Sequence, residues 1–299
     1  MNVRALPAPR QLRVDWRVVA ALMIVIPNLI YGGAYALATL RGGTAFDWWD
    51  LSEAGRRVVQ DPANLYAHDF LAPYTHGFRY SPLFAWLMVP IAFAGITIWR
   101  LAHFAVLALL PGRLAVIALL TWPFWEDVWH GNVLVFSFVT AYLALRGTRW
   151  AGVAFLLIAL LVPRPLYLPI LAWLAWKQPT WRLPGLAIVL VIGVATLATG
   201  LTGAWIGATL DMGYQLGYGL NLSPTRFIGP WWLLLGVPLG AWLTWRGHLG
   251  WAAFAVSPYV LPYYLIFGLL ELPRSWIDPR WRPSPVRPPR GRTQPPDDP

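Results

Sequence analysis

Charged residues and cysteine are the residue types that this chain of 299 residues lacks or nearly lacks. Aspartate, glutamate, lysine and arginine make up 12% of it and hydrophobic residues 58%, whereas an ordinary soluble domain is about 25% charged. So few charges cannot cover the surface of a soluble protein. The composition therefore excludes a soluble globular chain and indicates a polytopic membrane protein. The absence of cysteine excludes a disulfide scaffold and leaves the redox compartment open.

Acidic residues are scarcer than basic ones, 13 against 23, and the net charge is +10. All but one of the basic residues are arginines, which are scattered at the ends of apolar segments and in the carboxy-terminal tail. A nucleic-acid platform needs a basic stripe interleaved with aromatic residues, so we predict no nucleic-acid partner. In a membrane protein, positive charge marks cytoplasmic loops and contacts with headgroups, and we expect membrane lipids as partners.

Motifs of soluble enzymes are missing as well. The chain has no Walker loop, no dinucleotide-binding glycine fingerprint and no His-Glu-x-x-His sequence. Its five histidines lie far apart without ligand spacing, so we expect no cofactor and no structural metal. His68 and His76 share one acidic segment, and a divalent-ion site there is an alternative to ordinary solvated histidines.

The apolar runs predict an all-α integral membrane protein, a polytopic helix bundle of about 8–10 transmembrane segments. We divide the chain into a cytoplasmic basic arm (residues 1–15), a single membrane domain (16–271) and a disordered Pro/Arg-rich tail (272–299). The first apolar run, Val18–Leu40, is longer than the core of a signal peptide, so we favour a retained helix over a cleaved leader. The arginines before it place the amino terminus in the cytoplasm.

The only long polar stretch inside the apolar body is residues 41–80. Because it follows the first helix, we predict an external loop. Its apolar residues recur at near-helical spacing and predict an amphipathic helix in the membrane interface, with a face made of Trp48, Trp49, Leu51, Ala54, Val58 and Val59.

The later apolar runs predict the remaining helices. An embedded but non-spanning helix opens at Ser81-Pro82 and breaks at Pro90. Spanning runs follow at about residues 97–110, 114–125, 132–145, 151–161, 166–176, 183–201 and 229–245. Between them we expect external loops at 125–131 and 202–228 and a turn at Pro163-Arg164-Pro165. The last block, 249–270, is broken at Ser257-Pro258 and is either one kinked span or two short limbs.

The few acidic residues gather on the predicted external face, next to aromatic residues. Apart from Asp15 and the tail, every acid lies in such a segment: the 41–80 loop, Glu126-Asp127, Asp211 and Glu271. Carboxylates can bind sugar hydroxyls and indoles can stack on sugar rings, so this face is typical of a carbohydrate site. The alternative is that positive-inside topology alone leaves the acids outside.

Several short motifs follow one another in an order that resembles a known family. They are residues 46–56 (FDWWDLSEAGR), 64–66 (NLY), 78–84 (FRYSPLF), 129–133 (WHGNV), 151–152 (AG), 163–165 (PRP), 257–258 (SP) and 263–264 (YY). This order, over about residues 16–270, resembles the GT-C-type glycosyltransferases, and most closely glycosyltransferase family 87, the polyprenyl-phosphate-mannose-dependent mannosyltransferases.

The resemblance implies a GT-C-like fold and transfer of a hexose, mannose in that family, from a polyprenyl-phosphate donor to a glycolipid or glycan acceptor. The reaction would run at the external face of the plasma membrane with inversion at the sugar. The lack of a soluble nucleotide-binding domain also favours a lipid-phosphate donor over a nucleotide sugar.

The resemblance assigns the catalytic role of Asp47, and the types and positions of the other residues suggest theirs. Asp47 would be the general base that takes the proton of the acceptor hydroxyl, and Asp50, one helical turn later, would orient the acceptor or the base. Arg164 would bind the donor phosphate, because a guanidinium fork fits phosphate oxygens, with Arg79 as a second candidate. The sugar or lipid groove would be lined by Trp48, Trp49, Tyr66, Tyr80, Trp129, His130 and Asn132. Acceptor-holding candidates are Tyr214, Tyr218, Asn221 and Arg226.

The chain also departs from the family pattern. Arg164 stands in place of a lysine, Asn132 in place of a glutamine, and Tyr263-Tyr264 in place of two histidines. Two alternatives therefore stay open: a shortened, inactive homologue, and a non-catalytic transporter or lipid-binding protein. A transporter is expected to show paired repeats and acids within its spans, and we find neither in the sequence.

Overall fold

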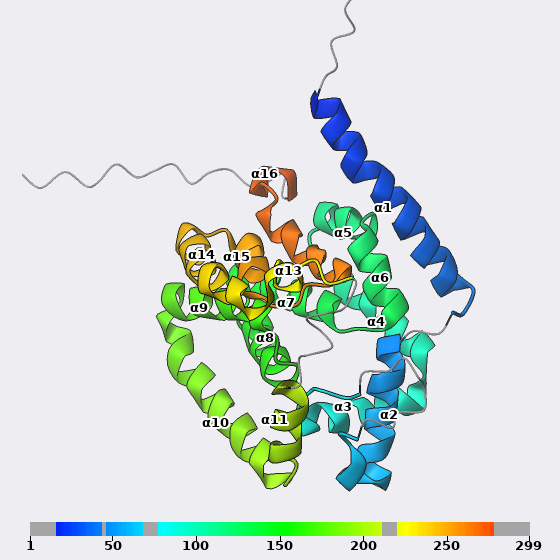
Figure 1. Ribbon diagram of the computed structural model, residues 1–299, viewed down its shortest axis with the longest axis vertical. Coiled ribbons are helices and arrows are strands. Elements are labelled where there is room, and N and C mark those ends of the chain that lie inside the picture. The colour runs from blue at the N-terminus through cyan, green and yellow to red at the C-terminus, as the bar shows by residue number, and fades with distance from the viewer. Residues whose placement is uncertain (1–15, 44–45, 68–76, 211–219, 278–299) are drawn as a thin grey trace, which may run out of the picture.

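A computed structural model describes residues 16–43, 46–67, 77–210 and 220–277, and these form helices and connecting turns without a β-strand (Figure 1). The predicted all-α class is therefore confirmed for the described part of the chain. The α-helices are α1 (Trp16–Leu40), α2 (Phe46–Gln60), α3 (Pro82–Ala94), α4 (Ile96–Leu107), α5 (Gly112–Leu119), α6 (Trp122–His130), α7 (Leu134–Leu145), α8 (Arg149–Leu161), α9 (Leu168–Lys177), α10 (Arg182–Ala198), α11 (Thr202–Leu210), α13 (Thr225–Ile228), α14 (Trp232–Arg246), α15 (Leu249–Val256) and α16 (Arg274–Ile277). Short 3₁₀ segments are η1 (Pro62–Asn64), η2 (Pro165–Tyr167), η3 (Pro179–Trp181), η4 (Gly229–Trp231) and η5 (Pro262–Glu271).

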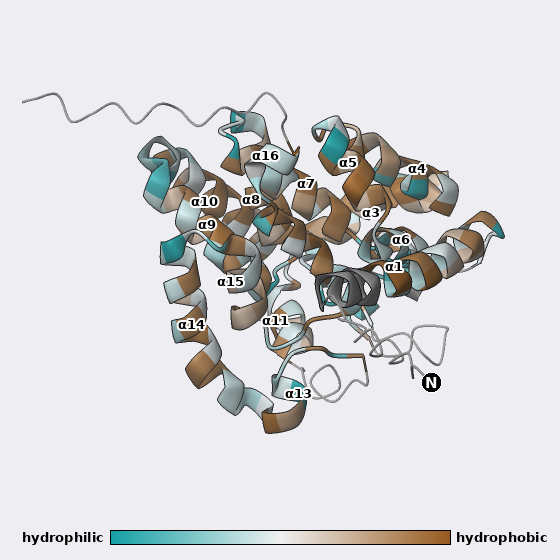
Figure 2. Cartoon of the chain, turned by 90° about the horizontal axis from the view of Figure 1, so that it is seen from above, coloured by the Kyte–Doolittle hydropathy of each residue, from teal (hydrophilic) through white to brown (hydrophobic). Residues whose placement is uncertain are grey.

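Among the described residues, two helical stretches are long and apolar enough to cross a membrane, Pro179–Ala198 and Thr225–Arg246. A third candidate is the pair α3 and α4, if the two helices count as one broken span. Apolar side chains along α10 and α14, such as Leu190 and Leu234, are exposed, and Figure 2 shows hydrophobic residues along α14 and hydrophilic ones mainly at helix ends. These surfaces suit contact with lipid. Several other predicted spans form helices of 8–13 residues, shorter than the roughly 20 residues of an upright crossing.

The helix that begins at Pro82 runs to Ala94 and breaks at Gly95. The predicted break at Pro90 is therefore wrong. α3 continues through Pro90 to Ala94, and the chain then bends by 111° into α4. Gly95 has a φ of 86°, a conformation that glycine adopts without the steric cost of a side chain. The backbone at this glycine, rather than the proline ring, therefore sets the corner that turns α4 toward the centre of the molecule.

The amphipathic helix predicted after the first helix is α2, but its apolar stripe packs on protein. Trp48, Leu51, Ala54 and Val58 are buried in a cluster with residues of α3. The helices approach so closely that a Cβ at Gly55 would lie 2.8 Å from the carbonyl oxygen of Met88. Trp49 and Val59, which we had assigned to the same stripe, are exposed. The contact with α3 fixes the direction of the first turn of α2, which carries Asp47.

The larger core surrounds α7, which lies in the middle of the molecule (Figure 1). Its sequence is apolar around its whole circumference, which is the pattern of a buried helix. Helices α4, α6, α8 and α9 and segment η5 pack on it. The start of α7 is consequently the point at which several elements meet.

Other boundaries differ from the predictions in ways that residue patterns explain. The predicted external loop 125–131 is helical as far as His130, since its Trp122-Pro123 start suits a first helical turn. The predicted loop 202–228 contains α11 and α13, and the predicted tail begins with α16. The final block consists of two limbs, α15 and η5, separated at Ser257-Pro258. The turn predicted at residues 163–165 lies between α8 and η2. The basic arm (1–15) lies outside the described residues.

Candidate functional site

The segment between α6 and α7 brings the predicted site residues together. Gly131 has a φ of 70°, and a Cβ there would lie 3.0 Å from the Cβ of Trp48. A residue without a side chain is therefore required for the first turn of α2 to approach. The next residue, Asn132, is buried and lies beside Asp47.

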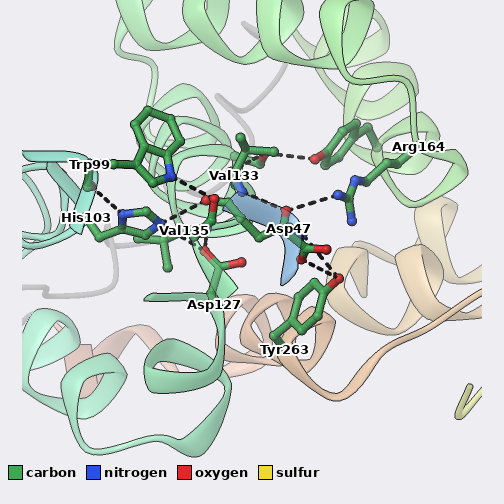
Figure 3. Close-up of polar contacts among 12 residues, drawn as sticks. Asp47, Trp99, His103, Asp127, Val133, Val135, Arg164 and Tyr263 are labelled. Atoms are coloured by element: carbon green, nitrogen blue, oxygen red, sulfur yellow. Dashed lines mark hydrogen bonds and ion pairs between the residues drawn. The ribbon is translucent and has the colours of Figure 1, made fainter. Parts of the chain in front are cut away.

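The side-chain amide of Asn132 bridges Asp47 and Arg164 (Figure 3). Its Nδ2 donates to Asp47 Oδ2 at 2.6 Å, and its Oδ1 accepts from Arg164 Nη2 at 3.0 Å. Oδ1 also accepts from the backbone N–H of Val133 at 2.6 Å, which fixes the orientation of the amide. A carboxylate and a guanidinium are thus held in one constellation by a neutral group.

Arg164 is enclosed by tyrosines. It donates to the hydroxyl of Tyr80 at 2.8 Å and to the hydroxyl of Tyr264. Its guanidinium carbon lies 5.7 Å and 4.9 Å from the centres of the same two rings, within cation–π range. Burial raises the pKa of Tyr80, and a phenol has an ordinary pKa of about 10, so both hydroxyls stay protonated and neutral.

Among the described residues, no carboxylate contacts Arg164 directly, and Asp47 is reached only through the Asn132 amide. In the part of the chain that the structure describes, Arg164 forms no ion pair, and its buried Nε has no hydrogen-bond partner. A buried cation with neutral partners and a spare N–H is costly unless an anion joins it. The arrangement can bind an oxyanion such as a phosphate.

Tyr263 completes the surroundings of Asp47. Its hydroxyl lies 3.4 Å from Asp47 Oδ2 and 3.2 Å from Asn132 Nδ2. The ring of His130 lies 5.7 Å from the Tyr263 ring. Burial lowers the pKa of His130, and the charges of Asp47 and Asp127 oppose that effect. The carboxylate of Asp47 is thus oriented by an amide and a phenol, an arrangement that suits a proton acceptor held in one position.

Two buried acids lie on α6 behind this constellation. Glu126 and Asp127 are almost fully buried. Burial raises the pKa of Glu126 to about 8, and the charges of Asp127 and Asp47 act in the same direction. Asp127 Oδ2 accepts from the backbone N–H of Val135 at 2.9 Å and lies 3.6 Å from His103 Nε2.

Some predicted site residues lie at the constellation and others do not. Tyr80 contacts Arg164 directly, and Tyr66 reaches the site through a hydrogen bond to the Tyr80 carbonyl at 2.8 Å. Trp129 packs edge-on against His130. Trp48 is buried against Trp99 and belongs to the core.

The remaining candidates have other surroundings in the structure. Trp49 is exposed, and Asp50 is half-buried on α2. The carbonyl of Arg79 accepts from Trp205 and Thr209. Asn221 ties its own loop to Pro258 and Val260, and Arg226 lies against Phe227. The candidates that lie outside the described residues are His68, His76, Tyr214 and Tyr218.

Sequence reasoning did not select four residues that the structure brings to the site: His103, Asp127, Tyr263 and Tyr264. The tyrosines belonged to the final motif and could have been chosen from it. His103 carried a weaker signal, a polar residue inside an apolar helical run, which is costly unless it is paired. Asp127 gave no such signal, because it falls in the predicted external loop 125–131.

No group of three or more histidine, aspartate or glutamate side chains that could hold a metal ion occurs among the described residues. Comparison of the chain with protein-family models, with curated proteins and with solved structures finds no match. Function therefore has to be argued from the geometry of this site.

Proposed function

We propose that the chain is an integral membrane glycosyltransferase of the GT-C type that transfers a hexose, mannose by the family resemblance, from a polyprenyl-phosphate donor to a glycolipid or glycan acceptor. The observation that carries the proposal is the Asn132 amide between Asp47 and Arg164. It keeps a base and a cation close together without direct contact between them.

The base has a defined task in this reaction. The acceptor hydroxyl oxygen attacks the anomeric carbon, the bond between that carbon and the phosphate oxygen breaks, and Asp47 takes the hydroxyl proton. Hydrogen bonds from Asn132 and Tyr263 hold the carboxylate in place, and attack from the side opposite the phosphate inverts the sugar. A positioned base contributes typically 10²–10⁴-fold to such a step.

The cation has the complementary task. Negative charge develops on the departing polyprenyl phosphate, and the Arg164 guanidinium, with its buried and unpartnered Nε, stabilises it. Because Tyr80 and Tyr264 are neutral, they orient the fork without weakening its charge. Preorganised charge of this kind is worth about 10²–10³-fold in rate.

The finer topology is part of the proposal. We propose a multi-pass bundle of about 8–10 membrane segments in the plasma membrane, in which short helices such as α7 and α8 lie between the longer ones. The amino terminus would lie in the cytoplasm and the Asp47 site at the external face, where a lipid-linked donor presents its sugar.

Transfer assays on matched variants test the proposal. The purified protein in lipid nanodiscs is given polyprenyl-phosphate-mannose and a membrane lipid extract, and labelled product is measured. Asp47→Asn should lower the rate at least about 100-fold. Asp61→Asn changes an exposed acid after the same helix and should leave the rate unchanged.

Two results would contradict the proposal. Transfer by Asp47→Asn at the wild-type rate would remove the general base. No transfer by the wild type with any of several lipid-linked sugars would favour an inactive homologue, or a transporter or lipid-binding protein that holds a lipid phosphate at Arg164 without transferring its sugar.

A further inference from the structure

His103 lies on α4 directly behind the candidate site, with no exposed surface. Both of its ring nitrogens face oxygen atoms. Nδ1 lies 2.8 Å from the carbonyl oxygen of Trp99, and Nε2 lies 2.8 Å from the carbonyl oxygen of Asn132. Nε2 also lies 3.6 Å from Asp127 Oδ2 (Figure 3).

These surroundings determine how many protons the ring carries. Carbonyl and carboxylate oxygens only accept, while a neutral imidazole has one N–H and one lone pair. A neutral ring would therefore point a lone pair at a carbonyl oxygen, and the ring has no exposed surface through which solvent could relieve the repulsion. Turning the ring over would place carbon atoms where the nitrogens are, and both hydrogen bonds would be lost.

The counter-charge is present at the required place. Asp127 is fully buried, and its Oδ2 is shared between the Val135 N–H and the His103 side. Its other oxygen, Oδ1, has no hydrogen-bond partner. Each charge alone would be expensive to bury, and each compensates the other.

We infer that His103 and Asp127 form a buried imidazolium–carboxylate ion pair, and that His103 is a positioning residue for the site. The His103 Nε2–H holds the Asn132 carbonyl, and the indole N–H of Trp99 holds the Gly131 carbonyl at 2.7 Å. The backbone that carries the Asn132 amide is thus fixed at two successive carbonyls. The amide in turn orients Asp47.

Thermal unfolding tests the ion pair without any assay of activity. The variants are His103→Gln, Asp127→Asn and the double variant, since both replacements keep a hydrogen-bonding group. Asp127→Asn should lower the Tm of the wild type by about 10 °C, because it leaves a buried cation unpaired. In the His103→Gln background the same change should raise the Tm, because there it removes an unpaired buried carboxylate.

The pair of His248 and Glu271, 3.0 Å apart with an exposed histidine and a partly buried glutamate, is the control. Glu271→Gln keeps an oxygen that can accept from the Gly250 N–H, so the effects of His248→Gln and Glu271→Gln on the Tm should be small and should add. If Asp127→Asn lowers the Tm equally in both backgrounds, the two groups are not an ion pair and the inference is overturned.

Nuclear magnetic resonance of protein with nitrogen-15-labelled histidine reads the protons directly. The His103 signals are those that disappear in His103→Gln. At neutral pH both of its nitrogens should show the shift of a protonated ring nitrogen. One protonated and one unprotonated nitrogen would identify a neutral tautomer and overturn the inference.

The positioning role rests on the proposed transfer reaction and has its own readout. A glutamine at position 103 can hold only one of the Trp99 and Asn132 carbonyls well. In His103→Gln the turnover per folded molecule should therefore fall about 10–100-fold, while the donor KM stays within about twofold. An unchanged turnover per folded molecule would reduce His103 to a structural residue. If the wild type transfers no sugar, the proposed function fails, and the unfolding and resonance experiments still decide the ion pair.

Discussion

Cations lie on aromatic rings in two regions of this protein. The two regions differ in whether the aromatic side chains can also accept a hydrogen bond from the cation. In the centre, Arg164 lies against Tyr80 and Tyr264 and is hydrogen-bonded to both hydroxyls. At the ends of α9 and α14, Lys177 lies 4.0 Å from the Trp176 ring, and Arg246 lies 5.8 Å from the Trp245 ring. Phenols accept hydrogen bonds, whereas an indole has only a donor N–H and its ring face.

This difference separates the proposed phosphate site from a surface contact. Arg164 is held in one orientation by directed hydrogen bonds, and its buried Nε has no hydrogen-bond partner. Lys177 and Arg246 rest on exposed tryptophans, where weak cation–π contact leaves the charge in solvent or among headgroups. Tryptophan beside a basic residue is typical of the membrane–water interface. Burial and the type of aromatic partner, rather than the cation itself, decide the role.

Replacing the central cation should have the largest effect. Arg164→Lys keeps the charge but loses the planar fork, and we expect transfer to fall about 100-fold, with a larger fall for Arg164→Met. Arg246→Lys, the same exchange beside Trp245 at the end of α14, should not change the rate of transfer. Initial rates over a range of donor concentrations measure both. Equal effects at the two positions would abolish the distinction between the regions.

The buried acid Glu126, on α6 behind the candidate site, should make the free energy of unfolding depend on pH. The pKa of Glu126 is raised from 4.5 to about 8 in the folded state, so between these pH values the folded protein binds more protons than the unfolded one. Stability should therefore fall as the pH rises from about 4.5 to about 8. Glu126→Gln should remove this slope and add roughly 3 kcal/mol at pH 7.

Denaturant unfolding at several pH values measures the effect of Glu126→Gln. Glu271→Gln is the control, since Glu271 is only partly buried and already pairs with His248. A slope that is the same in wild type and Glu126→Gln would show that another group carries the pH dependence.

Removing a single central hydroxyl should have a smaller effect. Tyr264→Phe keeps the ring over Arg164 but leaves a guanidinium N–H without its acceptor, which costs about 1–3 kcal/mol. Trp176→Phe also keeps a ring, under Lys177, and removes no acceptor, so its cost should be below about 1 kcal/mol. Unfolding free energies of the two variants compare them. A larger cost for Trp176→Phe would mean that ring contact, and not the hydroxyl, holds the central cation.

The double variant Lys177→Met/Arg246→Met should have the smallest effect on the isolated protein. Neither transfer nor the Tm in uncharged detergent should change measurably, since both cations are exposed. In nanodiscs, the wild type should melt at a higher temperature with phosphatidylglycerol than with phosphatidylcholine alone, and the variant should lose this difference. A difference that persists in the variant would place the lipid contact elsewhere.

A structural feature could be predicted from the sequence when neighbouring residues determine it, and not when distant packing does. The helical class and the stripe on α2 followed from residue spacing, and the turn at Arg164 followed from two prolines. The corner at Gly95 was misplaced because an interior proline is the stronger local signal, although packing held α3 together through Pro90. Trp49 and Val59 were assigned to the apolar face of α2 because residue spacing alone does not show which part of that face packs on α3.

The sequence by itself determined that the molecule is helical, apolar and poor in charged residues. Composition and the spacing of apolar residues act within a few residues of the chain and can therefore be read directly. Only the tertiary structure decided which of the few polar residues meet. Asn132 binds Asp47 across 85 positions and Arg164 across 32, and His103 faces Asp127 through the junction of α4, α6 and α7. Such meetings follow from close packing around α7 and from the cost of burying a charge alone, and neither is a property of any short stretch of sequence.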